Sequence, residues 1–502
     1  GVENNKTFAA GARNFTYDVN VVVAGRTVYS QAGLTHYHHA RWHQFAWWDA
    51  TREPAIHIKH NTAYLISSKA VSNYDQSVVP TETNLADYAR QTVAAITGPM
   101  KIGPLVPYMP TTGGRYDIGS LPSWSVTYLL SQDKRAKDLM MAAADGSATW
   151  SIHYRDENTG YPVRVDNEVN KNITFHMNLA HKGPLPVPRC ANNDGKLCET
   201  PYEADTAHQP STVYLPYLVT GDYYYLEELQ FWAAWNPLGT DPGYSGVGQG
   251  LVRWQQVRGQ AWSMRTMGHV AYITPDNHYM KAYFNKMLDN NLEYYQSTFL
   301  AADANQMGVY DGTGVAAFDN VHYAPWQDDF MTWSFGYLSE LGFTKATPIL
   351  QYKAKFPVGR MTAPGFCWIQ ASSYYLLSRD SDTAPRYKTF AELYAGNFKN
   401  DNIRDDNSNV VQNPLGLNYL DQPCASQAQA EWFSGAMGFT WSKGRMVGYA
   451  DAAMGYPANM QPALAVSVAS GIPNADAAWT TFSGRSAKPD YRIAPQWAII
   501  PR

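Results

Sequence analysis

The stretch GDYYYLEELQFWAAWN, from Gly221 to Asn236, decides the fold class of this protein. Gly221 can end one helix and Asp222 can cap the next, so the apolar run that follows them begins a new helix. Its aromatic and leucine side chains lie around most of the helical circumference. A helix that is apolar on several faces needs packing partners on several sides. A helix in a single surface layer would not need so many apolar faces. The stretch therefore predicts an inner helix of a layered, mainly α protein.

Similar apolar segments with helical spacing recur from about residue 84 onward, and we expect roughly ten to twelve helices. Short turns with glycine, proline or aspartate separate many of them, as at Thr274–Asp276 and Leu341–Phe343. Because short turns join elements that are neighbours in space, they predict antiparallel helical hairpins. The segments are Ser123–Ala144, Thr212–Trp235, Gln249–Tyr272, Asp276–Phe299, Asp328–Leu341, Gly365–Leu377 and Tyr387–Tyr394, with shorter apolar segments after Gln427.

Residues 1–83 predict a small N-terminal β-rich segment ahead of the helical domain, which we place at residues 84–502. Phe15–Ser30 alternates in character and is rich in β-branched side chains, with Ala24–Gly25 as a turn. Ala55–Ser67 has the same pattern. We therefore expect strands in both segments.

Composition and charge exclude several classes of protein. Charged residues make up only 16% of the 502 residues and aromatic residues 14%, which is typical of neither a disordered chain nor a coiled coil. The formal net charge of −4 supplies no positive field for a polyanion, so we expect no nucleic-acid partner. No apolar run approaches the roughly 18 residues of a membrane helix, and we expect a soluble protein without a membrane span.

The hairpin run GDYYYLEELQFWAAW, with RGQAWSMRTMGHVAYITPD and YMKAYFNKMLDNNLEYY after it, resembles the (α/α)-toroid enzymes that act on polysaccharides. This group includes six-hairpin glycosidases and toroid polysaccharide lyases. The resemblance concerns the architecture of about residues 84–480 and carries no catalytic motif. It implies an (α/α) toroid of helical hairpins whose partner is a polysaccharide or oligosaccharide.

The segment ADTAHQPSTVYLPYLVTGD, from Ala204 to Asp222, is the first candidate site. Asp205 and His208 lie three residues apart, just before a helix. A helix N-terminus favours anions and histidine titrates near neutrality, so the pair suits acid/base catalysis. The alternative is structural, with Asp205 as a helix cap and His208 as a hydrogen-bonded residue.

The segment DNVHYAPWQDDFMTWSFGYL, from Asp319 to Leu338, is the second candidate. It concentrates carboxylates and aromatic rings, the chemistry of a sugar subsite, because rings stack on sugar C–H faces while acids accept hydroxyl hydrogen bonds or transfer protons. Helix capping and core packing are the alternative. The candidate residues are His322, Tyr323, Trp326, Asp328 and Asp329.

Two arginines are candidates for holding an acidic sugar. Arg155 lies in the polar loop HYRDENTGYPVRVDN, and Arg258 shares a helix face with Arg265. A guanidinium can bind a carboxylate through two hydrogen bonds. For both arginines we favour the alternative of a solvent-facing ion pair, which needs no ligand.

We expect no metal cofactor, although two segments raise the question. His36, His38, His39 and His43 are close in sequence, yet no single conformation of the segment presents them all to one ion. The segment NDNIRDDNSN (400–409) has oxygen ligands for Ca²⁺ but lacks the order of an EF-hand loop. We interpret it as a solvated loop, with bound Ca²⁺ as the alternative.

The cysteines and the N-terminal residues predict an exported protein. Cys190 and Cys198 bracket a polar turn of a length that suits a disulfide-closed loop, with buried thiols as the alternative. The chain begins GVENNKTF without methionine, which fits removal of a leader peptide or a cloning scar. We therefore expect a secreted, extracellular or periplasmic protein.

The sequence has no GxxxxGK[ST], GxSxG or HExxH motif, which argues against nucleotide-dependent, serine-hydrolase and zincin chemistry. Together, these observations favour a secreted glycoside hydrolase. The catalytic carboxylates would be Asp205 and either Asp328 or Asp329, with His208 and His322 in support. One alternative is a polysaccharide lyase, in which His208 or Tyr323 removes a proton and Arg155 or Arg258 neutralises a uronate. A third possibility is a non-enzymatic structural or adhesive subunit, a homo-oligomer assembled through its N-terminal strand segment.

Overall fold

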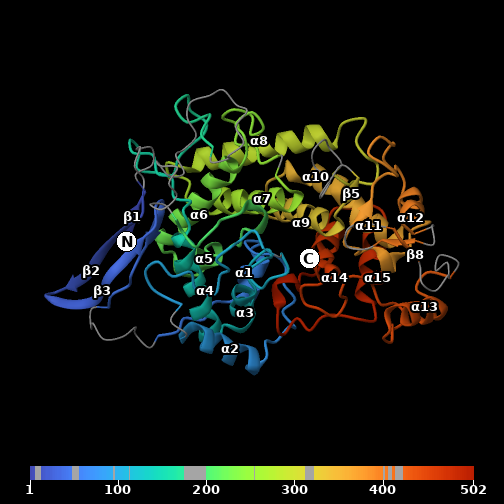
Figure 1. The fold of residues 1–502 in the computed structure, drawn as a ribbon, viewed down its shortest axis with the longest axis horizontal. Helices are drawn as coiled ribbons and strands as arrows, with labels where there is room; N and C mark the ends of the chain where they lie inside the picture. The colour runs from blue at the N-terminus through green and yellow to red at the C-terminus, as the bar shows by residue number, and fades with distance from the viewer. Residues whose placement is uncertain are drawn as a thin grey trace. The chain divides into compact units, whose positions relative to one another are not determined.

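The computed structural model is mainly helical, and the part of the chain that it describes also holds four two-stranded sheets (Figure 1). The mainly α class with a small N-terminal β element is therefore confirmed. None of the described helices is long and apolar enough to cross a membrane. The described residues are 1–5, 13–47, 56–93, 96–111, 113–174, 199–253, 255–310, 321–398, 402–404, 410–412 and 422–502.

The chain divides into two compact units. Unit 1 comprises Gly1–Ala70, Gln76–Gln255 and Trp262–Asn291. Unit 2 comprises Val71–Asp75, Gln256–Ala261 and Leu292–Arg502. Unit 1 runs across residues 83 and 84, where the sequence suggested a boundary, and it contains both β elements and helices.

The first predicted strand region forms the hairpin of β2 (Phe15–Val23) and β3 (Arg26–His36), drawn in blue in Figure 1. Ala24 and Gly25 form its turn with positive φ angles of 49° and 78°, a conformation that glycine adopts without strain. A second, shorter antiparallel pair joins β1 (Val2–Asn4) to β4 (Ala40–Trp42). This pairing brings the first residues of the chain onto the segment that follows the hairpin.

The strand predicted over Ala55–Ser67 was wrong, because its second half forms helix α1 (Thr62–Ser67). Asn61 caps this helix: its side chain accepts a hydrogen bond of 3.0 Å from the backbone N–H of Tyr64. An N-cap of this kind satisfies a backbone donor that the first turn of a helix would leave unpaired. The capping signal outweighed the alternating pattern.

The remaining helices of unit 1 follow the predicted segments, with breaks that local residues explain. The Ser123–Ala144 segment splits because Gln132 adopts the left-handed conformation and Asp133 caps the next helix. Gly221 and Asp222 divide the Thr212–Trp235 segment in the same way, as the sequence predicted. The helices are α2 (Glu82–Val93), α3 (Ser123–Ser131), α4 (Lys134–Gly146), α5 (Tyr214–Thr220) and α6 (Tyr223–Trp235).

Helices α7 (Val257–Ile273) and α8 (Lys281–Phe299) contribute residues to both units. The helices of unit 2 include α9 (Pro325–Glu340), which packs against α14 (Tyr456–Val468) at Gly336. A Cβ atom at Gly336 would lie 2.4 Å from Cβ of Val466, so the close approach of the two helices requires glycine there. The other elements are α10 (Ala346–Lys353), α11 (Lys355–Thr362), α12 (Phe390–Phe398), α13 (Gln427–Met437), α15 (Ala475–Ser483), β7 (Asn402–Arg404) and β8 (Val410–Gln412).

The helix predicted over Gly365–Leu377 was also wrong. The segment forms a 3-10 turn at Trp368–Gln370 and the short strand β6 (Leu376–Leu377), which pairs with β5 (His322–Tyr323). Two serine side chains bond to backbone carbonyls there, Ser372 to Val447 at 2.9 Å and Ser373 to Gln370 at 2.9 Å. Serine competes in this way with the backbone ladder of a helix.

Residues 71–75 meet the last residues of the sequence in unit 2. Asp75 N–H donates to Ala498 O at 2.8 Å, and Ile500 N–H donates to Asn73 O at 2.9 Å. The guanidinium of Arg502 donates to Val71 O at 2.7 Å. The short segment at residues 71–75 thus belongs to the same unit as the residues around 500.

One disulfide is confirmed among the described residues, between Cys367 and Cys424, whose Cα atoms are 5.3 Å apart. The sequence had suggested a bridge between Cys190 and Cys198, and that pair lies outside the described residues. The bridge closes a loop of 57 residues in unit 2.

Candidate functional site

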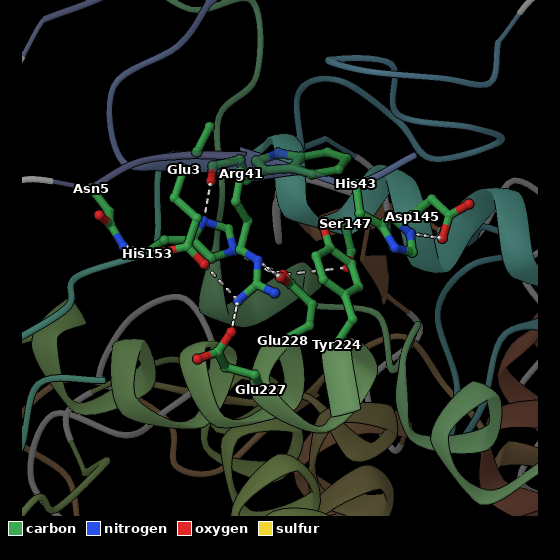
Figure 2. A network of polar contacts seen from close by, with 12 residues as sticks. Glu3, Asn5, Arg41, His43, Asp145, Ser147, His153, Tyr224, Glu227 and Glu228 are labelled. Carbon is green, nitrogen blue, oxygen red and sulfur yellow. Dashed lines mark hydrogen bonds and ion pairs between the residues drawn. The ribbon is translucent and has the colours of Figure 1, made fainter. Parts of the chain in front are cut away.

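A buried charged network lies in unit 1, where α6 meets the strands β1 and β4. Figure 2 shows Arg41 reaching toward both glutamates of α6, Glu227 and Glu228. The Arg41 guanidinium donates to Glu227 at 2.5 Å, and its Nε atom lies 3.7 Å from Glu228. Arg41 also pairs with Glu3 of β1 at 3.3 Å. Because the guanidinium and Glu228 are buried, their pairing offsets the cost of removing both charges from water.

The environment of His153 in this network fixes where its protons lie. Nδ1 contacts two backbone carbonyl oxygens, His39 O at 2.9 Å and Trp150 O at 3.0 Å, so it must carry a hydrogen. Nε2 faces both carboxylate oxygens of Glu228, at 3.0 and 2.9 Å. His153 Nε2 and the Glu228 carboxylate therefore share the hydrogen that lies between them. His153 and Glu228 were not identified from the sequence, because glutamate on an inner helix gives no pattern of its own.

Arg155, a predicted sugar ligand, belongs to the same network. Its guanidinium makes two hydrogen bonds to Glu3, of 2.9 and 2.7 Å, and one of 2.8 Å to Glu227. Burial would raise the pKa of Glu227, but Arg155 and Arg41 outweigh that effect and hold it below its usual value. The contacts of Arg155 are thus to carboxylates of this chain, as the ion-pair alternative expected.

The first sequence candidate, Asp205 with His208, forms a direct pair in unit 1. Asp205 Oδ2 and His208 Nδ1 share a short hydrogen bond, and Asp205 also accepts from Ala207 N–H at 3.2 Å. Asp205 caps the 3-10 turn η2 (Thr206–His208), so the cap predicted as a structural alternative exists alongside the pair. The Asp205 side chain is 26% exposed, whereas His208 is buried. The carboxylate is therefore the open member of the pair.

Two residues that the sequence did not identify, Arg115 and Asp117, support His208. Arg115 donates to the backbone oxygen of His208 at 3.3 Å and to that of Met109 at 3.0 Å. Its Nε atom donates to Asp117 at 2.9 Å. Burial raises the pKa of Asp117, while Arg115 and His208 act in the opposite direction. The arginine and aspartate of GGRYDIG, residues 113–119, were the signal that could have found them.

An exposed carboxylate and two exposed tyrosines accompany this pair. Tyr108 and Glu203 form an isolated β-bridge, and Met109 N–H donates to Glu203 O at 3.0 Å. Glu203 is thus held in an extended segment that continues to Asp205, whose φ and ψ are −143° and 134°. Glu203 is exposed and lies two residues before Asp205. Exposed Tyr108 is its bridge partner, and exposed Tyr116 is next to Arg115.

The second sequence candidate lies in unit 2, where its carboxylates are buried in ion pairs. Asp328 pairs with Lys353 of α10 at 2.5 Å and accepts from Tyr310 N–H at 3.1 Å, while Asp329 pairs with Arg360 of α11. Burial raises the pKa of Asp329 to about 7, with Arg360 opposing and Asp328 adding to the rise. These contacts tie α9 to α10 and α11. Asp205 belongs to unit 1, so the three predicted carboxylates are divided between the two units.

The other candidates of that segment are buried as well. His322 and Tyr323 form strand β5, where the His322 ring packs edge-on against Tyr375 at 5.0 Å. Trp326 stacks on Tyr374 with ring centroids 6.0 Å apart, and the Arg258 guanidinium lies 5.2 Å from the Trp326 ring. The structure thus joins Trp326 to Arg258, two residues named for separate reasons in the sequence.

The histidines that raised the question of a metal have protein partners. His36 contacts Tyr17 OH and Ala40 O, both at 3.0 Å. His43 pairs with Asp145 at 2.6 Å and stacks on Tyr224, as Figure 2 shows. Among the described residues, no three metal-ligating side chains form a group that could hold an ion. The Asp/Asn segment considered for Ca²⁺ lies almost wholly outside those residues.

Comparison with known proteins was made at the level of families, sequences and structures. No protein-family model matches this chain, and neither a curated protein nor a solved structure matches it.

Proposed function

We propose that the protein is a secreted glycoside hydrolase of the (α/α)-toroid type that acts on a polysaccharide through Glu203, Asp205 and His208. The observation that carries the proposal is the hydrogen bond between partly exposed Asp205 and buried His208, with exposed Glu203 two residues before Asp205. Glycoside hydrolysis needs two carboxyl groups, one as acid and one as base or nucleophile. Export agrees with the disulfide of unit 2.

The spacing of the two carboxylates suits this chemistry. Two residues of extended chain span about 6.6 Å along the backbone. Glycosidases place their carboxyl groups about 5 to 9.5 Å apart, according to whether a water molecule must fit between them. Exposed Tyr108 adds a ring face on which a sugar can stack.

The two carboxylates have different surroundings, which is what separates an acid from a base. Glu203 is exposed, while Asp205 is half-buried and shares a hydrogen with His208. His208 acts through Asp205 as a positioning residue, because it is buried and is itself held by Arg115. In this arrangement Asp205 exchanges a proton with the sugar oxygen or water, and His208 keeps its carboxylate oriented.

The test is an activity screen of the whole chain against neutral and uronic-acid polysaccharides. Reducing ends and the ultraviolet absorbance of an unsaturated product are followed together. We expect new reducing ends without the absorbance, and a loss of about 10²–10⁴-fold in Asp205→Asn and Glu203→Gln. The control is Glu157→Gln, which removes another exposed carboxylate of unit 1.

Three other outcomes of this screen are informative. A rise of both signals would assign the polysaccharide lyase activity, with His208 as the base. Full activity in Asp205→Asn would remove this site from the reaction. Silence across the panel would overturn the enzymatic proposal.

A second candidate function is self-assembly as a structural subunit, favoured by the β2–β3 hairpin. Most residues of both strands are exposed, including the large side chains of Phe15 and Val22. A two-stranded sheet is marginally stable by itself, so a further strand from a second copy would stabilise it. Sedimentation velocity of the wild type and of Val22→Asp tests this. A monomer at every concentration in both proteins would dismiss assembly through the hairpin.

A further inference from the structure

A ladder of four aromatic rings runs through unit 2, from the first turn of α9 to the loop before α14. Trp326 stacks on Tyr374, with ring centroids 6.0 Å apart and planes 14° from parallel. Tyr374 contacts Tyr456 at 5.2 Å, and Tyr456 contacts Tyr449 at 6.3 Å. The rings come from three separate segments of the chain, at residue 326, at residue 374 and at residues 449–456, and the fold brings these segments together.

The ladder leads from the interior to the surface. Trp326 is 7% exposed, Tyr374 36% and Tyr449 73%. At the buried end, the Arg258 guanidinium lies over the Trp326 ring. Tyr374 and Tyr456 pack against Trp326, and Tyr449, at the far end of the ladder, exposes most of its side chain to solvent.

The backbone at Tyr449 is strained. Its φ is +61°, in the left-handed region that bulky residues rarely occupy. The loop is held in place around it: Val447 N–H donates to Ile369 O at 2.9 Å, and Tyr456 N–H donates to Gly448 O at 2.9 Å. Gly455 packs against the Tyr449 carbonyl so closely that a Cβ atom there would lie 2.0 Å from the oxygen.

Strain of this kind concentrates where it serves a function, because a chain free of that demand relaxes it by substitution. Asparagine or glycine adopts the left-handed conformation with less strain. A tyrosine there places a large ring in solvent at a cost in stability, and its contact with Tyr456 still leaves it 73% exposed. The cost is explained if the ring binds a ligand.

We propose that Tyr449, Tyr456 and Tyr374 form a binding surface for the pyranose rings of a polysaccharide. Pyranose rings present C–H groups on their faces and hydroxyl groups at their edges, which match the faces and hydroxyl edges of tyrosines. Successive rings of the ladder offer contacts to successive sugars of a polymer. The surface shares its ligand class with the proposed function but does not depend on catalysis by Asp205.

The test is binding of the whole chain to soluble polymers, with hydroxyethylcellulose and polygalacturonate as the neutral and uronate probes. Measurements in the Asp205→Asn background prevent cleavage of the probe. We expect Tyr449→Ala to weaken binding about 3- to 10-fold, the effect of one aromatic contact. Tyr449→Phe keeps the ring and should retain most of the affinity.

Two variants separate binding from folding. Tyr449→Asn relieves the backbone strain, so its melting temperature should equal or exceed that of the wild type while its affinity falls. Phe439→Ala removes another exposed ring of unit 2 and should leave binding unchanged. Unchanged affinity in Tyr449→Ala, or no binding of either polymer by the parent protein, would overturn the proposal. Loss of binding with hydrolysis intact would leave the proposed function standing, and the reverse result would leave this surface standing.

Discussion

His153 and Glu228 face each other in the interior of unit 1, where both carboxylate oxygens lie within 3.0 Å of the same ring nitrogen. Both side chains are fully buried. The other ring nitrogen is committed to two backbone carbonyls. Glu228 thus holds His153 directly, while Arg41 of β4 lies 3.7 Å from it and donates to its neighbour Glu227.

Replacing Glu228 with glutamine should destabilise unit 1 by about 3 kcal/mol. The substitution removes a buried carboxylate that faces His153 at 2.9 Å and lies 3.7 Å from Arg41, and removing one partner of a buried charged pair is costly. Chemical denaturation followed by circular dichroism measures the loss. Glu157→Gln serves as the matched control, because that carboxylate is exposed and its removal should cost almost nothing.

Stability should fall in acid partly through Glu227. Its pKa is held below its usual value of 4.5, so its ion pairs contribute fully above that pH and are lost as pH falls through the lower folded-state value. Glu227→Gln should therefore cost about 2 kcal/mol at neutral pH and progressively less in acid. Denaturation curves of both proteins over a pH series measure this. A gap between them that stays constant down to the acid limit would contradict the assignment.

Gly336→Ala should destabilise unit 2 by about 1 to 3 kcal/mol, because the added methyl group overlaps Val466. Shortening the facing residue should relieve the overlap. We therefore expect Val466→Ala, mildly destabilising alone, to recover part of the loss when combined with Gly336→Ala. Melting temperatures of the two single variants and the double variant supply the cycle. Strictly additive losses would show that the two helices do not meet at these residues.

Removing the Cys367–Cys424 bridge should cost about 4 kcal/mol, the chain-entropy value for a closed loop of 57 residues. The variant with both residues changed to alanine should melt earlier than the oxidised wild type. Treatment with a reductant should bring the wild type close to the variant. If the reductant lowers the melting temperature of both proteins equally, this bridge is not the one that matters.

The sequence predicted the helix boundary at residues 221 and 222 better than the structure of the segments Ala55–Ser67 and Gly365–Leu377. Glycine and aspartate at positions 221 and 222 marked a true helix boundary, because their backbone preferences act locally. The same kind of local signal, Asn61, was overlooked in a segment whose alternation suggested a strand. In Gly365–Leu377 the apolar spacing was helical, but the bond from Ser372 to Val447 and the pairing with β5 decided the outcome. Those partners come from distant parts of the chain, which periodicity does not contain.

The candidate site shows the same division. Asp205 and His208 could be predicted together because they are three residues apart, and the structure shows that they bond to each other. Arg115 and Asp117 support that pair from a segment some ninety residues earlier, as the contact between Arg115 and His208 shows. Asp328 and Asp329 had the composition of a sugar site, yet each is buried against a cation on another helix. Composition predicted the chemistry of these groups, while only the tertiary structure showed their surroundings.

The contact between residues 71–75 and the residues around 500 has a consequence for biosynthesis. Asn73 leaves the ribosome 427 residues before its partner Ile500. At about 5 to 20 residues per second, the segment that contains Ile500 is synthesised on the order of 20 to 90 s after the early segment. Residues through Asn291 suffice for unit 1, which can therefore fold during translation. Unit 2 can close only once residues 498–500 have been made, and a nascent chain stalled shortly before residue 498 would carry an unfinished second unit.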